Sequence, residues 1–418
     1  MPGRLTAVTA VAAFAAFAAA LILPAGTAAA APPRIPSAAA TQDPATVTLE
    51  RLWSRGGEDD EEVLFGHPRD VVTDTAGHVL VLDAQLCQIV IFDRDGELMG
   101  TVGREGEGPG EFRRPGGLLA LPDGQVAAAS SFGARFQLLD LDGTPHGSLP
   151  LGGDGPQEGV YILYRAEYRA GTLVGATTTS AFDQASGQMH RVQNLATFAL
   201  DGSHRADLRE AKLDLDFTGV RPLAEETLLR YFLIVSAIGP DGLIYVPHSR
   251  DEYLVDVFDP DGTLLRQVGR PDFRAPRRTE REQRRLAALR DTWTRNAGIE
   301  INFETSPSEM TVQSLFVDER GHLFVRHAGS NRDLPRGAFL RLDEFAPDGT
   351  WMREVVVRGV GDPELDTLIW LDAGRVAVQR GGALIALERW SDAAVFWEDE
   401  AEVVPELVVC AWQLPPSR

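Results

Sequence analysis

Six polar residues recur at one position of a repeated pattern, six residues after a glycine that ends a short turn. They are Asp83, Ser130, Thr177, His248, His327 and Arg380. Carboxylate, hydroxyl, imidazole and guanidinium groups can together bind a polar ligand. The residue three positions earlier is apolar or small in every copy, so we expect each polar residue to end a strand. The alternative interpretation is that these groups accept hydrogen bonds from loop amides.

A metal site is a further alternative for the same set. Zinc requires three converging ligands, and only His248 and His327 come from adjacent copies, with His67 as a third histidine elsewhere. Calcium prefers carboxylate and amide oxygens. The asparagines, at positions 194, 296, 302 and 331, all lie outside this register. We therefore predict no cofactor, with zinc or calcium as the alternative.

Three arginines flank the glycine-rich segment 106–112 and could contact an anion: Arg104, Arg113 and Arg114. A phosphate-binding loop needs a helix N-terminus behind it and usually a lysine. Here the segment leads through a proline into an apolar run typical of a strand. We favour a tight crossing between repeats, with Phe112 packed between sheets.

The elements that must position these residues are hairpins. A turn ending in glycine precedes six apolar, β-rich runs, at Gly77, Gly124, Gly171, Gly242, Gly321 and Gly374. A second turn, usually Asp-Gly, alternates with it five times, at Gly96, Gly143, Gly202, Gly262 and Gly349. Two hairpin turns per repeat predict four antiparallel strands in each of six repeats.

The sixth repeat lacks its second turn, because the chain ends soon after a third strand at 407–412. Residues 46–53 alternate polar and apolar with period two and precede the first repeat. We predict that this segment supplies the missing strand and closes the ring, which removes free sheet edges. The expected fold is an all-β, six-bladed β-propeller of four-stranded antiparallel blades over residues 45–414.

The first two repeats resemble NHL-type six-bladed propellers. The resemblance rests on the run from Pro68 to Asp83, the turn at 92–96 and the linker Gly-Pro-Gly-Glu-Phe at 108–112, which is similar to that of exported bacterial members. It implies the fold and leaves the function open, because such propellers include binding scaffolds, lactonases and lyases. A lactonase-like member would use calcium, and a peptide-amidating lyase would use zinc.

Two segments depart from the repeat and predict short helical insertions. One lies near 276–296, where Thr279 and Glu282 form a capping box, and the other lies near 383–397. Either could be loop decoration that shields the propeller, or a lid or partner-docking helix.

The beginning of the chain has the features of an export signal. Arg4 precedes an apolar run at 7–23, and small residues surround Ala31, so we predict a signal peptide over 1–31. A membrane anchor is the alternative, because the run is near the lower length limit for spanning. We expect a flexible linker over 32–44, a tail over 415–418, and no membrane span after cleavage.

Composition limits the partners. The net charge of −21 disfavours nucleic acid, whose phosphates require a positive face. Cys87 and Cys410 fall in strand-like contexts and read as buried thiols, although export would permit a disulfide. We predict a monomeric periplasmic or secreted binding scaffold for a protein, a peptide or a small polar ligand. The alternative is a metal-dependent enzyme that uses the same face.

Overall fold

The computed structural model describes residues 32–36, 39–113, 115–130, 132–152, 160–183, 188–216, 223–224, 230–297, 303–382 and 404–415. The chain divides into two compact units, residues 1–32 and 33–418. The first unit, and with it the predicted signal peptide, lies outside the described residues except for Pro32. All that follows concerns the second unit.

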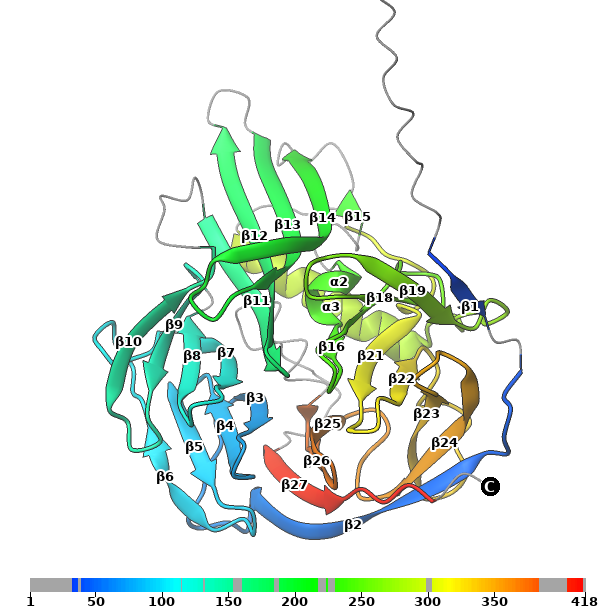
Figure 1. Ribbon diagram of the computed structural model, residues 1–418, viewed down its shortest axis with the longest axis horizontal. Coiled ribbons are helices and arrows are strands. Elements are labelled where there is room, and N and C mark those ends of the chain that lie inside the picture. The colour runs from blue at the N-terminus through cyan, green and yellow to red at the C-terminus, as the bar shows by residue number, and fades with distance from the viewer. Residues whose placement is uncertain are drawn as a thin grey trace, which may run out of the picture. The chain divides into compact units, whose positions relative to one another are not determined.

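The described chain is all-β apart from two helices, and its four-stranded antiparallel sheets are arranged as in a propeller (Figure 1). The first sheet contains β3 (Pro68–Thr73), β4 (Val79–Asp83), β5 (Gln88–Phe92) and β6 (Leu98–Val102). The second contains β7 (Pro115–Ala120), β8 (Val126–Ser130), β9 (Arg135–Leu139) and β10 (Pro145–Pro150). The third contains β11 (Val160–Arg169), β12 (Thr172–Asp183), β13 (Gln188–Phe198) and β14 (His204–Asp216).

Two larger sheets contain the remaining long strands. A five-stranded sheet joins β1 (Arg34–Pro36), β19 (Leu264–Gly269), β18 (Leu254–Phe258), β17 (Ile244–Pro247) and β16 (Ala237–Ile238). An eight-stranded sheet begins with β21 (Val312–Val317), β22 (Leu323–His327), β23 (Ala338–Phe345) and β24 (Trp351–Gly359). It continues with β2 (Ala45–Gly56), β27 (Glu406–Ala411), β26 (Arg375–Gln379) and β25 (Thr367–Asp372). Strands β15 (Leu223–Ala224) and β20 (Phe303–Glu304) pair separately.

The turn glycines explain where most hairpins reverse. Gly77 has φ +87° and Gly96 has φ +88°, a region that a side chain rarely adopts. The remaining turn glycines of the two series also have positive φ, with the exception of Gly374. At Gly374 the turn does not use the left-handed region, and the Asp372 carboxylate accepts a hydrogen bond from the Gly374 amide at 3.2 Å.

Strand β2 joins two groups of strands in the eight-stranded sheet, β21 to β24 on one side and β25 to β27 on the other. Residues 50–56 pair antiparallel with β27, where the segment 46–53 was expected to lie. Residues 45–49 pair parallel with β24, a contact that the repeat did not predict. A single strand thereby hydrogen-bonds to the outer strand of one group and the last strand of the chain.

The segment predicted as a flexible linker contains the short strand β1, which pairs parallel with β19. Arg34 donates a hydrogen bond from Nε to Gln267 Oε1 at 2.8 Å. A side chain at Gly349 would meet Ile35 at 3.1 Å, so the segment also lies close to the turn before β24. Backbone pairing at the sheet edge orders part of this segment, despite its proline- and alanine-rich composition.

The core lies between neighbouring sheets. Strand β4 is buried along its whole length, because its side chains alternate between two sheet faces that are both covered. One cluster joins Leu82 and Ile89 of the first sheet to Leu118 of the second. Another joins Val71 of the first sheet to Val409 of β27. Both Cys87 and Cys410 are buried, and burial raises the pKa of Cys410 to about 11.

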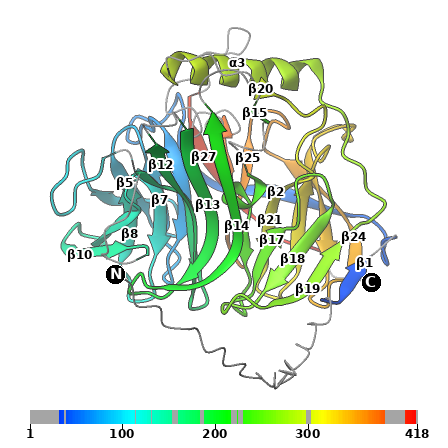
Figure 2. The ribbon, with the colours of Figure 1, turned by 90° about the horizontal axis from the view of Figure 1, so that it is seen from above.

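Helix α3 (Glu280–Ala297) occupies the first predicted insertion and lies across one end of the strands (Figure 2). Its predicted capping box is present: the Thr279 amide donates to Glu282 Oε2 at 2.7 Å, and the Glu282 amide donates to Thr279 Oγ1 at 3.3 Å. A second, unpredicted helix is α2 (Tyr231–Ile234). The insertion expected near 383–397 lies outside the described residues. Among the helices that are described, neither has the length and apolarity required to cross a membrane.

Candidate functional site

Asp83 is the last residue of β4, and its side chain binds the loops on either side of this strand. It is fully buried, and its carboxylate accepts hydrogen bonds from the backbone amides of Gly66, His67, Gln85 and Leu86 at 2.7–3.1 Å. These donors use the lone pairs of both oxygens. The arrangement matches the loop-amide alternative for this residue.

In the third sheet, the position six residues after the turn glycine does not coincide with the end of the second strand. Ser130 ends β8, whereas Thr177 lies in the middle of β12 and is 4% exposed. The strands of the third sheet extend further than those of the first two sheets, so six residues after the turn glycine do not reach the strand end. A fixed count cannot detect a change in strand length.

The two histidines have different acidic neighbours. His248 follows β17, and its Nδ1 lies 2.9 Å from Asp256 Oδ2. His327 ends β22 and is 7% exposed, with its Nε2 at 3.7 Å from Asp343 Oδ2. The structure does not bring them to a shared partner, so they form two separate polar contacts.

His327 lies in an aromatic environment. Its ring centroid is 4.7 Å from that of Phe273 and 5.8 Å from that of Tyr253, and its Nδ1 contacts Ala328 O at 2.9 Å. Burial lowers the pKa of His327, although the nearby Asp343 carboxylate opposes this effect. The neutral imidazole is therefore the form that suits the folded state.

We expect His327 to make the protein less stable in mild acid. Because its pKa is lower in the folded state, the unfolded state binds the proton first as the pH falls below the unfolded value of about 6.5. The free energy of unfolding should decrease as the pH falls through this range. Denaturant unfolding at a series of pH values should show a smaller decrease for His327→Phe. Equal slopes for both proteins would contradict the expectation.

The remaining predicted arginines have acidic partners. Arg380 follows β26 and donates to Asp366 Oδ2 at 2.8 Å. Arg104 donates to Glu111 Oε1 at 2.8 Å, and Arg113 donates to Glu107 Oε1 at 2.5 Å. Arg114 lies outside the described residues. Anion binding by this set stays a prediction.

The loop that carries Arg104 and Arg113 is built around Phe112, which is 1% exposed. A side chain at Gly103 would meet the Phe112 ring at 2.1 Å, so this crossing requires glycine there. The packing agrees with a structural role for the glycine-rich segment.

A cavity of 810 Å³ lies among the innermost strands, and it is the strongest candidate site. Its lining comes from β3, β7, β11, β16, β21 and β25, the strands nearest the centre in Figure 1. None of the six residues singled out by the repeat register belongs to this lining. The first strand of each repeat supplies most of the lining, and Gln379, the last residue of the second strand β26, also contributes.

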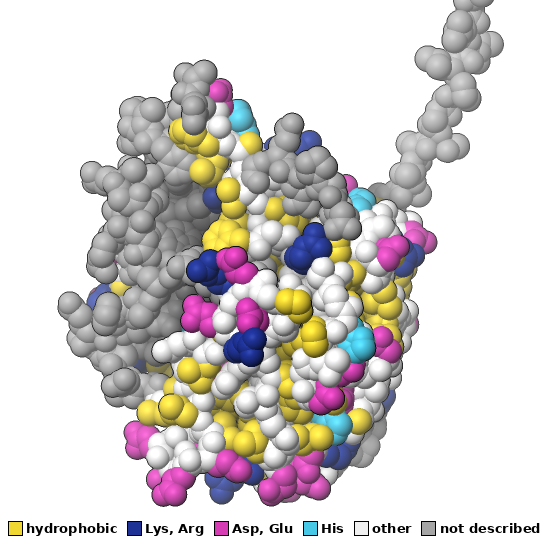
Figure 3. Space-filling model, turned by 90° about the vertical axis from the view of Figure 1, so that its left-hand side faces the viewer, with side chains coloured by type: hydrophobic (Ala, Val, Ile, Leu, Met, Phe, Trp, Pro, Cys, Tyr) yellow, Lys and Arg dark blue, Asp and Glu magenta, His cyan; other side chains and the backbone are white. Residues whose placement is uncertain are grey.

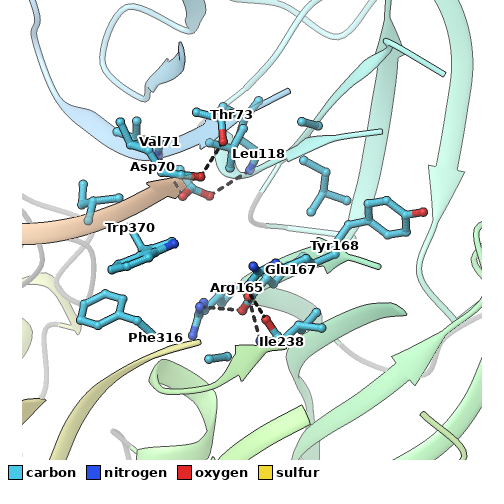
Figure 4. A pocket seen from close by; sticks show the side chains of 18 of the residues that line it. Asp70, Val71, Thr73, Leu118, Arg165, Glu167, Tyr168, Ile238, Phe316 and Trp370 are labelled. Carbon is cyan, nitrogen blue, oxygen red and sulfur yellow. Dashed lines mark hydrogen bonds and ion pairs between the residues drawn. The ribbon is translucent and has the colours of Figure 1, made fainter. Parts of the chain in front are cut away.

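Two of the acidic residues in the lining, Asp70 and Glu167, lie on opposite sides of the cavity (Figure 4). Among the described residues, Asp70 on β3 accepts hydrogen bonds only from the amides of Val71 and Leu118, each at 3.1 Å. Glu167 on β11 accepts from Arg165 at 2.8 Å and from the Ile238 amide at 3.1 Å. No described cation pairs with Asp70, so its carboxylate retains capacity for further donors.

Burial raises the pKa of Glu167, and the negative charge of Asp70 adds to this effect, while Arg165 opposes it. Perturbed carboxyl groups in a cavity are a frequent feature of functional sites. Both oxygens of Glu167 already accept hydrogen bonds, which favours the carboxylate form. The geometry therefore supports Glu167 as a fixed acceptor in the wall.

Side chains of β11 also link neighbouring strands. Arg165 donates to Ser236 O at 2.8 Å, and Arg169 donates to Ile238 O at 3.0 Å and to Val317 O at 2.6 Å. These guanidinium groups satisfy carbonyls at the inner sheet edges. Their first role is to hold the wall in place.

The aromatic part of the wall comes from Phe316 on β21 and Trp370 on β25 (Figure 4). The Trp370 ring stacks on Phe324, with centroids 5.9 Å apart and planes at 19°. Trp370 Nε1 is buried and has no hydrogen-bond partner in the part of the chain that the structure describes. An unpaired buried donor is uncommon in a folded protein and marks this side of the cavity.

The sequence contained one signal for this site that the register missed. Arg165, Glu167 and Arg169 alternate with other residues along 160–169, which gives a strand one consistently charged face. Charge alternation on a strand usually indicates a solvated face. In this structure the charged face of β11 instead contacts neighbouring sheets, through the hydrogen bonds of Arg165 and Arg169 described above.

Within the described part of the chain, no group of three or more His, Cys, Asp or Glu side chains is arranged to hold a metal ion. On the surface shown in Figure 3, hydrophobic side chains are interspersed with acidic and basic ones. The cavity remains the better-defined site.

Part of the chain matches a known protein family. A family described as a 6-bladed beta-propeller matches residues 58–118, which include the first sheet and the linker after it. No curated protein matches.

Solved structures with a similar chain path include a calcium-binding protein, regucalcin, from Agrobacterium tumefaciens, at 13% identity and TM-score 0.39, covering 88% of this chain and 96% of that one. A virginiamycin B lyase from Staphylococcus aureus has 9% identity and TM-score 0.39, with coverages of 78% and 84%. A member of the duf4221 family from Bacteroides vulgatus has 10% identity and TM-score 0.45, with coverages of 89% and 99%. At these values the ligands and activities of those proteins do not transfer to this chain. The family match and the sheets together identify the chain as a β-propeller.

Proposed function

We propose that this protein is an exported, monomeric binding module whose central cavity takes a small polar ligand. The observation that carries the proposal is Asp70, a carboxylate with no cationic partner in the described wall of an 810 Å³ cavity. A ligand that presents hydroxyl or amine donors would complete its hydrogen bonds. The aromatic wall at Trp370 and Phe316 would pack against the apolar part of that ligand.

The architecture that we propose around this cavity is a closed ring of six blades of the NHL type. The pairing of β2 with both β24 and β27 supports closure by the N-terminal strand, and the family description supports six blades. The ends of the second strands, where His248 and Arg380 lie, remain a second candidate surface for a peptide or protein. The cavity is favoured because it offers enclosure as well as polar groups.

A test of the proposal is a screen of small polar compounds by thermal shift, followed by calorimetry. We expect Asp70→Asn to weaken binding of any hit at least about tenfold, equivalent to about 1.4 kcal/mol. The variant keeps the size of the side chain and removes its charge. Asp142→Asn, on an exposed turn between β9 and β10, provides the matched control. Equal affinities for wild type and Asp70→Asn would exclude this cavity as the site.

The metal-dependent enzyme is the alternative proposal for this protein. Its test is metal analysis after purification without chelator, with turnover of lactones or peptidyl substrates measured in parallel. Stoichiometric zinc or calcium together with turnover would replace the binding module as the proposed function.

A further inference from the structure

Arg326 on β22 has a guanidinium group without a partner among the described residues. It makes no hydrogen bond or ion pair in the described part of the chain, and its Nε is buried. Burial lowers its pKa, and Glu309 is the nearby charge that opposes this effect. Glu309 itself accepts a hydrogen bond from Gln313 at 3.0 Å. A half-buried cation in this state is costly, unless a ligand supplies the missing anion.

The register places Arg326 beside the cavity. Arg326 pairs with Ser314 across β21 and β22, and Phe324 pairs with Phe316. Directly opposite residues in an antiparallel pair project from the same face, with Cβ atoms about 4.5–5.5 Å apart. Ser314 and Phe316 both line the cavity, so Arg326 lies one strand behind that lining.

The same side of the cavity contains the second unpaired donor. Trp370 stacks on Phe324, which lies two residues before Arg326 on the same face of β22. No hydrogen bond joins β21 to β25 in the described chain, whereas side chains link β3 to β7 and β11 to β16. This side of the cavity therefore has the Trp370 indole in its wall and the Arg326 guanidinium one strand behind it, and neither has a hydrogen-bond partner among the described residues.

We propose that Arg326 and the Trp370 indole N–H bind the oxyanion of a carboxylate or phosphate group on the cavity ligand. The planar guanidinium suits two parallel hydrogen bonds to such a group, and the indole can supply a third. This inference deepens the proposed function and rests on it: the ligand would carry an oxyanion near Arg326 and donor groups near Asp70. Hydroxy acids, amino acids and sugar phosphates have this combination.

The first experiment measures thermal stability without ligand. Arg326→Gln is expected to have a melting temperature equal to or higher than that of the wild type, because it removes a half-buried charge that has no partner among the described residues. Arg353→Gln is the matched control, since Arg353 is buried and donates to Glu344 at 2.6 Å, and it should lower the melting temperature. A comparable loss in Arg326→Gln would show that this chain neutralises Arg326 itself, and would overturn the inference.

The second experiment follows the indole N–H of Trp370 and the Nε–H of Arg326 by nitrogen-15 NMR, with the indole signal assigned from Trp370→Phe. Sodium phosphate and sodium citrate are titrated separately, with sodium chloride at the same ionic strength as the reference. We expect a saturable shift of both signals with at least one oxyanion, at about 1 mM or tighter, and its loss in Arg326→Gln. The responding salt identifies phosphate or carboxylate as the preferred group.

No shift with either salt, or a shift that persists in Arg326→Gln, would overturn the oxyanion site. The two proposals can fail separately. A ligand that requires Asp70 but binds Arg326→Gln with wild-type affinity would leave the cavity proposal intact and remove this one. Oxyanion binding that is unchanged in Asp70→Asn would support this site even if no larger ligand is found.

Discussion

Replacement of Glu344 by alanine is expected to lower the free energy of unfolding by about 3–5 kcal/mol. Glu344 on β23 is fully buried, and it accepts hydrogen bonds from Arg353 at 2.6 Å and from His322 at 2.7 Å. The side chain of Arg353 is 7% exposed, so loss of the carboxylate leaves a buried guanidinium without its ion pair. The expected effect is large because Arg353 stays buried after its carboxylate partner has been removed.

Chemical denaturation monitored by tryptophan fluorescence would measure this loss. Glu354→Ala is the control, because Glu354 is 31% exposed and lies 3.8 Å from Arg341, a separation at which an ion pair contributes little. The double variant Glu344→Leu/Arg353→Met should recover most of the stability, since both buried charges are then absent. A loss in Glu344→Ala no larger than that of the control would contradict the assignment.

Removal of strand β2 is expected to abolish cooperative folding. Val47 and Leu49 of this strand are buried at 1% and 4% exposure against β24, and each such side chain contributes about 1.5–3 kcal/mol. The truncation also exposes the edges of β24 and β27. These losses together are comparable with the whole stability of a typical domain, about 5–15 kcal/mol.

Two truncations test this expectation. A protein that begins at residue 57 should show no sharp thermal transition and should aggregate, whereas one that begins at residue 45 should retain the transition at a lower temperature. The second truncation removes β1 and keeps β2 intact. Circular dichroism and size-exclusion chromatography distinguish the outcomes. Cooperative melting of the shorter protein would show that β2 is dispensable.

Much of the architecture could be predicted because hairpin turns have local chemical signatures. Glycines at turns such as Gly96 and Gly143 occupy φ values that other residues rarely adopt, so the alternation of turns was visible in the sequence. The capping box at Thr279 depends on neighbours three residues apart and was equally visible. Gly374 shows the limit of this signature, because it is a turn glycine that does not have a positive φ.

The candidate site was harder to predict, because its contacts join residues distant in the sequence. Arg165 reaches the carbonyl of Ser236, 71 residues further along the chain. Asp70 reaches the Leu118 amide, 48 residues away. An aspartate on a strand gives no local indication of whether it faces water, a cavity or the next sheet. Arg326 is a stronger example, because the sequence cannot show that its guanidinium lacks a partner among the described residues.

The two pairings of β2 also have a consequence for the order of events during synthesis. Glu50 lies beside Ala411, so this contact must wait until the ribosome has added roughly 360 residues, which takes about 20–70 s. The pairing with β24 can form earlier, because those residues are made sooner. Throughout this interval the second half of β2 has no partner strand. The nascent chain therefore depends on slow, long-range association to complete its last sheet, as high contact order implies.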